Sequence, residues 1–432
     1  MSRPRTPGGA AMKSLGCPRP GGTRHPETLL SAGPLTAALD RAVRVGQHEN
    51  EADRLRSALD EALFPLSDDV PAASAFSGDP AVAAVLRVAL ANAPQLRHRY
   101  QGYLDLADAR LDDIVHSRLQ AARRRLHRRI PAERAEFSLR EGLVGFGACL
   151  LQRPGPDPML VEVLAYLVEL VLSSDGASRP GWWVHHSPLD DLSEAAEWPA
   201  GHACFTLPDG SAGIMALLAL ARLRGVRVPH LDSALRAVVA WHRAHQRTDE
   251  RGRPHWPEAV TEPHPDPRPS AHREGNVQGP GWCGNLGIAR AVQLAGLALG
   301  DPGLRRTAVA AAHAALTRDA HLFETGGICH GPHGAAFTAL RIAADEGSLP
   351  LADAAAELLS AVCPDARIGD VHGGLLDGSV GERLTRPPGN PRIVLPPAGA
   401  APWDSLLLLA PHRTPRADPR PALTRTDTRR PN

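Results

Sequence analysis

Hydrophobic residues recur along most of this chain at helical spacing. The segments LTAALDRAV (35–43), ADRLRSALDEAL (52–63) and LDSALRAVVAWHRAH (231–245) place apolar residues at positions i, i+3 and i+4, with arginine and aspartate on the opposite face. The most apolar run, residues 159–172, carries Glu162 and Glu169 and is shorter than a membrane span, which indicates a buried helix. Because alternating, strand-like runs are scarce, the pattern predicts an all-α protein.

A glycine repeat marks the start of successive apolar helices. Gly-x-x-Gly precedes an apolar run at Gly142, Gly210, Gly284 and Gly331 and, more weakly, at Gly378. Successive first glycines are 68, 74, 47 and 47 residues apart, and a spacing of 47 fits one helical hairpin with its loops. Since glycine allows backbones to approach closely, we expect the glycine-marked ends to gather at one mouth of a closed α/α ring. An open solenoid of hairpins would give a similar signal.

Length and composition narrow the class further. The chain has 432 residues and a net charge of +1, so nothing in it indicates a nucleic-acid or membrane surface. Residues 1–34 and 411–432 are rich in Gly, Pro and Arg without periodicity, which predicts disordered tails around one domain at 35–410. Without an apolar signal core, and with six cysteines in a chain this long, we expect a cytoplasmic protein with no disulfide scaffold and no integral membrane segment.

Two glycine-rich loops combine the residue types that bind zinc. Cys283 lies in PGWCGNLG, and Cys329 and His330 are adjacent in GICHGPHG. A catalytic zinc has three protein ligands of these types and an open fourth position. Adjacent residues on a helix point ~100° apart, so Cys329 and His330 can converge only where the backbone leaves helical geometry, as the surrounding glycines allow. Spacing alone leaves a zinc site and two unrelated loop thiols about equally open.

Three further features of the sequence are the other cysteines, a long interruption between helices and an arginine-rich stretch. Cys149, Cys204 and Cys363 are expected in the core. The long interruption at 247–281 ends directly at the Cys283 loop, which favours a segment that covers a site over a plain linker. The arginine-rich stretch 118–134 is interpreted as a solvated helix face rather than a docking site for an acidic leader peptide.

From about residue 138 to 408 the chain resembles the lanthionine synthetase C family, the lanthipeptide cyclases. The motifs that carry the resemblance follow the family's order: PGWWV (180–184), GHACFTLPDGSAGIMALLALA (201–221), HWPEAV (255–260), GWCGNLGIARAVQLAGLALGDP (281–302), ICHGPHGA (328–335), LLDGSVG (375–381) and PWDSLLLL (402–409). The resemblance implies an α/α toroid and a Zn²⁺ ion held by Cys283, Cys329 and His330. It also implies a standalone class I cyclase.

The resemblance further implies a reaction and its partners. Cysteine thiols of a dehydrated, leader-bearing precursor peptide add to dehydroalanine or dehydrobutyrine, which forms lanthionine or methyllanthionine thioethers. A free thiol has a pKa near ~8.5, whereas a metal-bound thiol loses its proton. The enolate that results needs a proton donor. A dehydratase and a transporter are the expected partners. Such a biosynthetic complex would place the protein at the periphery of the membrane.

Several positions depart from the family pattern. Asp209 stands where the family has a histidine, Gly279 where a basic residue is common, and Ser138 where some class I members have an aspartate; the tyrosine that commonly follows the first zinc-binding cysteine is absent. Asp209, His333 and His202 are therefore the candidate proton donors. Each also has a structural interpretation: a helix N-cap for Asp209, a helix cap for His333 and a loop residue for His202.

Two other functions remain open from the sequence. A catalytically impaired zinc-binding scaffold would bind the precursor peptide and partner enzymes without closing rings efficiently. Alternatively, helical toroids host glycosidases, which need paired carboxylates across a cleft. Asp190, Asp191, Asp209 and Glu258 are available for that role, although no motif arranges them as an acid and a nucleophile.

Overall fold

The computed structural model describes residues 30, 33–45, 50–63, 73–173, 179–185, 201–261, 279–318, 323, 327–361, 373–385 and 403–410. Most of the expected N-terminal tail, all of the expected C-terminal tail, and Cys363, Asp190 and Asp191 lie outside the described residues. Within the described part, no helix is both long enough and apolar enough to span a membrane.

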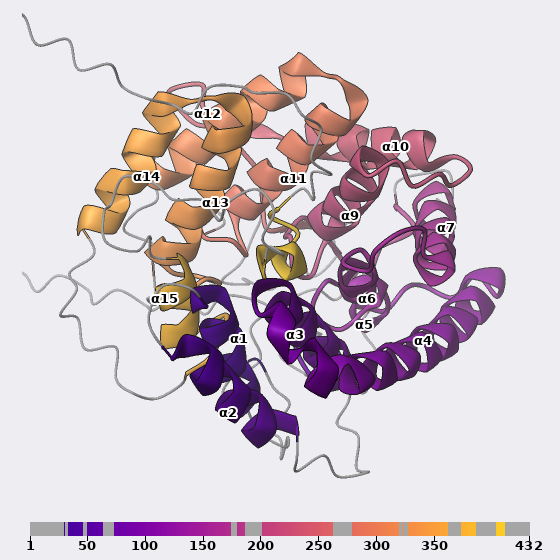
Figure 1. Cartoon of the computed structure of the whole chain (residues 1–432). Coiled ribbons are helices and arrows are strands. Elements are labelled where there is room, and N and C mark those ends of the chain that lie inside the picture. The colour runs from indigo at the N-terminus through magenta and orange to yellow at the C-terminus, as the bar shows by residue number, and fades with distance from the viewer. Residues whose placement is uncertain are drawn as a thin grey trace, which may run out of the picture.

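An inner layer of helices forms a closed ring (Figure 1). Its members are α1 (Pro34–Arg44), α3 (Gly78–Asn92), α6 (Leu143–Leu150), α9 (Ser211–Leu223), α11 (Asn285–Leu299), α13 (Pro332–Glu346) and α15 (Ser379–Thr385). Each helix contacts the next one in this order, and α15 contacts α1. The contact between the last and the first helix confirms the predicted all-α toroid and excludes the open solenoid.

An outer layer surrounds the inner ring. It contains α2 (Glu51–Leu63), α4 (Arg97–His127), α7 (Pro158–Leu172), α10 (Leu231–Ala244), α12 (Pro302–Arg318) and α14 (Leu349–Ala361), each packed on the inner helix that precedes it. The layers differ in pattern: α6 is buried along its whole length, whereas α4 buries one stripe and exposes its arginine-rich face. On α7, Glu162 is exposed and pairs with Arg123, so that helix is buried on one side only.

Short connecting elements complete the described chain. The helix α5 (Arg134–Phe137) and the 3-10 turn η2 (Pro94–Leu96) link longer helices. Four short strands form two antiparallel pairs: β1 (Ala203–Cys204) with β4 (Ala259–Val260), and β2 (Arg247–Thr248) with β3 (Pro254–His255). The first part of the predicted long loop at 247–281 therefore folds back on the ring, and residues 262–278 lie outside the described part.

The repeated glycines share one packing role. A Cβ atom at Gly145, Gly213, Gly334 or Gly381 would lie 2.1, 2.5, 2.0 or 1.8 Å from the carbonyl oxygen six residues earlier. At Gly287 the carbonyl is five residues earlier, at 2.0 Å, because that turn is one residue shorter. A side chain at any of these positions would collide with backbone. Gly33 precedes α1 and Gly78 begins α3, but Thr36 and Ala81 stand where the second glycine of the repeat would be. A search for Gly-x-x-Gly therefore does not find these two hairpins.

The turns before the inner helices join into a second ring, here called the loop ring: residues 30, 75–76, 139–140, 207–208, 281–283, 328–330 and 375–376. Backbone hydrogen bonds of 2.7–3.3 Å link neighbouring turns: Leu30 to Phe76, Ala75 to Arg140, Leu139 to Pro208, Cys283 to Cys329, Cys329 to Leu376, and Leu375 to Leu30. Turns 207–208 and 281–283 are joined by side-chain packing: Leu207 packs against Gly287 on α11, where an added Cβ atom would lie 3.0 Å from Leu207 Cβ. The loop ring includes Leu30, which the sequence placed in the tail.

The segment 403–410, including the 3-10 turn η4 (Trp403–Leu407), lies at the centre of the toroid (Figure 1). The Trp282 indole N–H donates to the Leu407 carbonyl at 3.1 Å. Arg290 is fully buried; its guanidinium donates to the Leu409 carbonyl at 2.9 Å and forms an ion pair with Asp345 at 2.6 Å. Since a buried arginine must be paired, these contacts fix the segment firmly in the ring.

Candidate metal centre and its surroundings

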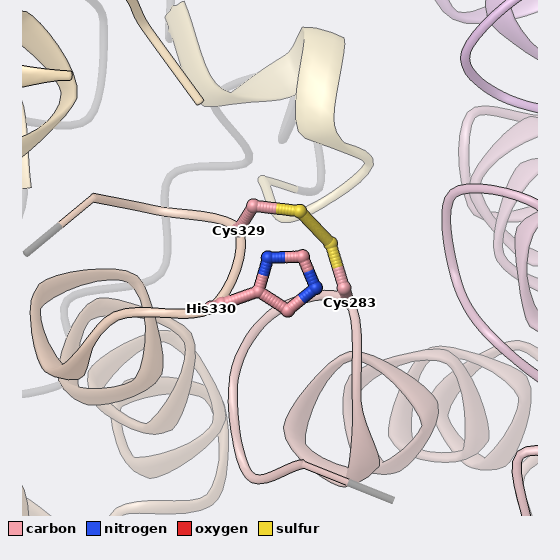
Figure 2. Close-up of side chains that lie close together, drawn as sticks. All are labelled: Cys283, Cys329 and His330. Carbon is pink, nitrogen blue, oxygen red and sulfur yellow. A yellow bond between two sulfur atoms is a disulfide. The ribbon is translucent and has the colours of Figure 1, made fainter. Parts of the chain in front are cut away.

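The structure brings Cys283, Cys329 and His330 together at the loop ring (Figure 2). One donor atom from each residue lies within 4.8 Å of the others. Cys283 precedes α11 and the other two precede α13, and the Cys283 N–H donates to the Cys329 carbonyl at 3.1 Å. Among the described residues no other group of three His, Cys, Asp or Glu side chains is close enough to hold a metal ion.

Local backbone geometry explains how two adjacent residues converge. Cys329 and His330 lie before α13, which begins at Pro332, so they are outside helical geometry as the sequence predicted. Gly281 allows the two loops to meet: a Cβ atom there would lie 2.5 Å from the Cys329 carbonyl oxygen and 3.2 Å from His330 Cα. Any larger residue at this position would push the loops, and therefore the donor atoms, apart.

A disulfide joins Cys283 and Cys329 in the structure (Figure 2). The sequence predicted two thiolate ligands and no disulfide framework, so this bond is a correction to that expectation. Its physical reason is proximity: the Cα atoms are 5.3 Å apart, within the range that a disulfide spans. The disulfide and a metal centre use the same two sulfur atoms and exclude each other, because only a thiolate binds a metal.

In the reduced state the donor set fits zinc. Zinc takes Cys sulfur at ~2.3 Å and His nitrogen at ~2.0 Å in tetrahedral geometry, which places donors about 3.3–3.8 Å apart. The three donor atoms already lie within 4.8 Å of one another, so small side-chain rotations suffice. Cys329 is buried, Cys283 is 8% exposed and His330 is half-buried, so the site is largely shielded from solvent. Three protein donors would leave the fourth position of a tetrahedral ion available.

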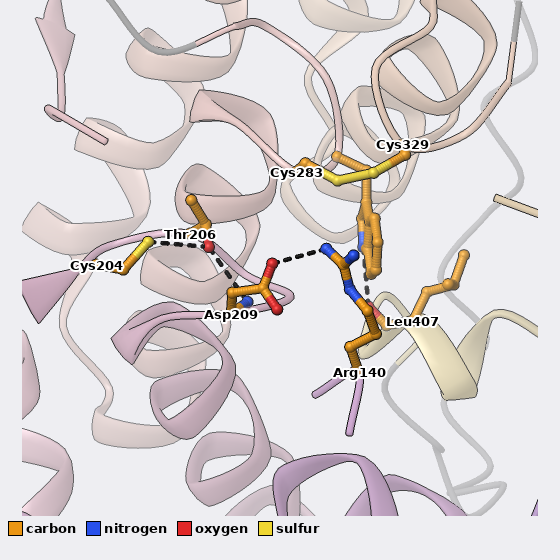
Figure 3. Close-up of a disulfide and its surroundings, with 8 residues drawn as sticks. Arg140, Cys204, Thr206, Asp209, Cys283, Cys329 and Leu407 are labelled. Atoms are coloured by element: carbon orange, nitrogen blue, oxygen red, sulfur yellow. Dashed lines mark hydrogen bonds and ion pairs between the residues drawn. A yellow bond between two sulfur atoms is a disulfide. The ribbon is translucent and has the colours of Figure 1, made fainter. Parts of the chain in front are cut away.

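An ion pair lies in the surroundings of the two cysteines (Figure 3). The Arg140 guanidinium donates to the Asp209 carboxylate at 2.7 Å, with the side chains 15% and 11% exposed. The two residues belong to adjacent turns of the loop ring, before α6 and α9 respectively. Gly210, not Asp209, is the N-cap of α9, so the structural interpretation of Asp209 as an N-cap is wrong. The backbone N–H of Asp209 donates instead to Thr206 Oγ1 at 3.2 Å.

The two candidate histidines lie in other contacts. His333 is in the first turn of α13, 1% exposed, with Nε2 3.5 Å from an Oε1 atom of Glu382 on α15. His202 is also buried, and its backbone exchanges hydrogen bonds with Val184 at 2.9 and 3.0 Å. Neither belongs to the group of donor atoms at Cys283.

Two cysteines outside the metal centre show how burial changes the pKa of a thiol in this protein. Burial raises the pKa of Cys149 to about 12, and burial together with the nearby Glu258 carboxylate raises the pKa of Cys204 to about 12. Both thiols therefore stay protonated at neutral pH. Cys149 is in the core as predicted, whereas Cys204 is only partly buried and contacts Thr206.

Arg140 is the site residue that the sequence analysis missed. Its signal was weak: one arginine, two residues before a repeat glycine, in a chain that contains 48 lysines and arginines. Its partner Asp209 lies 69 residues away, so only the packing of two turns reveals the pair. All five tryptophans of the quoted motifs are buried: Trp182, Trp183, Trp256, Trp282 and Trp403.

The geometry agrees with comparisons to known proteins. The family model for "Lanthionine synthetase C-like protein" matches residues 34–375, and the chain belongs to this family. Among solved structures it is similar to nisin cyclase, with 18% sequence identity and a TM-score of 0.68 over 89% of this chain and 92% of that chain. At this identity the likeness establishes the toroidal fold. No curated protein matches the chain.

Proposed function

We propose that this protein is a zinc-dependent lanthipeptide cyclase, which adds cysteine thiols of a dehydrated precursor peptide to dehydroalanine or dehydrobutyrine. The observation that carries the proposal is the convergence of Cys283, Cys329 and His330 at the loop ring of an α/α toroid. Membership of the lanthionine synthetase C-like family and the structural likeness to a protein named for cyclising nisin support a peptide substrate.

The chemistry follows from the donor set. Zinc bound by Cys283, Cys329 and His330 would supply a thiolate from the peptide cysteine at neutral pH. The surrounding side chains are largely buried, which limits water around the reacting atoms and strengthens electrostatic contacts with them. Because both cysteine ligands must be reduced, the proposal places the active protein in a reducing compartment such as the cytoplasm.

The substrate also implies partners. Dehydroalanine and dehydrobutyrine arise from dehydrated serine and threonine, so a dehydratase must act first on a leader-bearing precursor. A transporter, and a complex at the membrane periphery, stay predictions that rest on the family resemblance.

A second function is favoured by one observation. Asp209, at the position where the family has a histidine, is engaged in an ion pair with Arg140. A carboxylate held by a guanidinium does not supply the imidazole of the family's histidine, which favours a zinc-binding scaffold that holds precursor peptide and partner enzymes without efficient ring closure. Nothing arranges Asp209 and Glu258 as the paired acid and nucleophile of a glycosidase: the first pairs with Arg140 and the second lies near Cys204.

Elemental analysis of the reduced full chain tests the metal. We expect about one zinc per chain in the wild type, no zinc in Cys283→Ala, and undiminished zinc in the control Cys204→Ala, whose thiol is outside the donor group. A folded, reduced wild type without zinc would overturn both the cyclase and the scaffold.

A cyclisation assay then separates the two functions. A synthetic peptide with one dehydroalanine and one cysteine does not change mass on ring closure, so the loss of thiols that react with N-ethylmaleimide is the readout. Zinc-dependent loss of the peptide thiol supports the cyclase. Bound zinc without turnover supports the scaffold.

A further inference from the structure

We propose that Arg140 stabilises the anionic oxygen that forms on the peptide during thiol addition, and that Asp209 is the residue that positions Arg140. The inference rests on the cyclase function proposed above and assigns a role to a residue outside the zinc donor set. It starts from the geometry of the Arg140–Asp209 pair in the surroundings of Cys283 and Cys329 (Figure 3).

The pair is not needed to join the two turns that carry it. The backbone N–H groups of Leu139 and Arg140 already donate to the Pro208 carbonyl, at 2.8 and 3.3 Å. The helix α9 begins at Ser211, with Gly210 as its N-cap and no side-chain cap from Asp209. A charged pair with side chains 15% and 11% exposed is costly to desolvate and adds little where backbone bonds suffice. The fold therefore does not explain why an arginine and an aspartate are paired at the loop ring, and we look for the reason in the chemistry of the site.

Thiol addition to dehydroalanine generates an anion that a nearby cation would stabilise. When the peptide thiolate attacks, a bond forms between sulfur and the β-carbon of dehydroalanine. The π electron pair moves onto the α-carbon and the adjacent carbonyl oxygen, which gives an enolate. The thiol proton goes to solvent, and water returns a proton to the α-carbon. In a partly buried site the enolate oxygen needs a preorganised donor, which is worth about 10²–10³-fold in kcat in comparable oxyanion sites.

Arginine suits this task and aspartate does not. A guanidinium carries five N–H donors in a planar fork, so one group can hold a carboxylate and also donate to a second oxygen. Asp209 fixes the orientation of the fork through the bond at 2.7 Å. If Asp209 were the proton donor it would have to be protonated, and the ion pair that positions Arg140 would then be lost. Arg140 thus contacts the reacting atoms, and Asp209 acts through Arg140.

The test uses the reduced, zinc-loaded full chain and the synthetic peptide with one dehydroalanine and one cysteine. Arg140→Gln should lower kcat by about 10²–10³-fold, with zinc content unchanged and KM within a few-fold. Arg140→Lys should recover part of the lost rate, and Asp209→Asn should lower kcat by a smaller factor. The matched control is Arg153→Gln. Arg153 is 13% exposed and pairs with Asp112 and Asp157 beyond the other end of α6, so its loss should leave kcat unchanged.

A charge swap separates catalysis from structure. In the double variant Arg140→Asp, Asp209→Arg the ion pair can reform, so the melting temperature should return toward the wild-type value while kcat stays low. Recovery of kcat in the swap, or a wild-type kcat in Arg140→Gln, would overturn the inference and leave the cyclase function standing. A zinc-loaded wild type that does not cyclise the peptide removes the cyclase function and the inference together.

Discussion

Two sides of the loop ring have the same construction and carry different chemistry. On one side, the turns before α11 and α13 bring together Cys283, Cys329 and His330. On the other, the turns before α6 and α9 bring together Arg140 and Asp209. Both sides use a glycine packed against a backbone carbonyl, and a backbone hydrogen bond joins the turns on each side. The turn is therefore a general scaffold, and the side chains it presents can change while the fold is kept.

The largest expected effect is the loss of zinc binding on oxidation, which changes the metal side and leaves the Arg140–Asp209 side intact. Oxidation of the zinc-free protein should close the Cys283–Cys329 disulfide and reduce zinc uptake from about one ion per chain to none, because neither sulfur can then bind a metal. Elemental analysis and thiol titration before and after treatment with a reductant measure this. Reduction should restore both free thiols and zinc uptake. Zinc uptake by fully oxidised protein would show that other residues hold the ion.

Matched glycine substitutions sharpen the comparison. Gly281→Ala and Gly213→Ala each place a Cβ atom 2.5 Å from a backbone carbonyl oxygen, one on the metal side and one on the Asp209 side. Both should lower the free energy of unfolding by about 1–3 kcal/mol, in urea denaturation. Zinc affinity should fall in Gly281→Ala only, because Gly281 packs on Cys329 and His330.

The control for these variants is Gly102→Ala on the outer helix α4, where a Cβ atom would meet nothing within 4 Å. This change should raise the free energy of unfolding by about 0.5–1 kcal/mol. Equal loss of zinc affinity in Gly281→Ala and Gly213→Ala would mean that the two sides are mechanically coupled and not independent.

The last prediction concerns the pH dependence of stability on the Asp209 side. His242 is buried, accepts or donates a 2.9 Å hydrogen bond with Ser211 at the start of α9, and burial, with His245 nearby, lowers its pKa to about 3. In the unfolded chain His242 takes up a proton near pH 6.5, whereas in the folded chain it does so only near pH 3. The free energy of unfolding is therefore highest above pH 6.5 and falls as the pH decreases toward 3. At pH 5.5 the loss is about 1.4 kcal/mol.

Melting temperature measured between pH 7.5 and 5 checks this expectation. His242→Gln should flatten the profile, while His116→Gln, which removes an exposed histidine from α4, should leave its slope unchanged. An unchanged slope in His242→Gln would assign the acid sensitivity to other groups.

The sequence predicted those parts of the molecule whose signals are local. The inner helices after the repeat glycines, and the Cys329–His330 pair in a non-helical turn, were predicted because a few adjacent residues determine them. Two hairpins were missed where Thr36 and Ala81 replace the second glycine. The predicted metal ligands converge, while their redox state was expected to be reduced and is oxidised in the structure.

The remaining features depend on contacts between distant segments. The Arg140–Asp209 pair joins residues 69 positions apart, and Arg290 reaches Leu409 across 119 positions. No periodicity or motif signals such a contact, since either residue alone is compatible with an exposed position. The burial of His333 against α15 is of the same kind.

The central segment 403–410 also sets an order of events during synthesis of the protein. The indole of Trp282 and the guanidinium of Arg290 find their acceptors at Leu407 and Leu409, which the ribosome makes more than a hundred residues later. Until that segment is made, the Trp282 indole and the Arg290 guanidinium lack these carbonyl acceptors. The packing at the centre of the toroid is therefore completed only when residues 403–410 are in place.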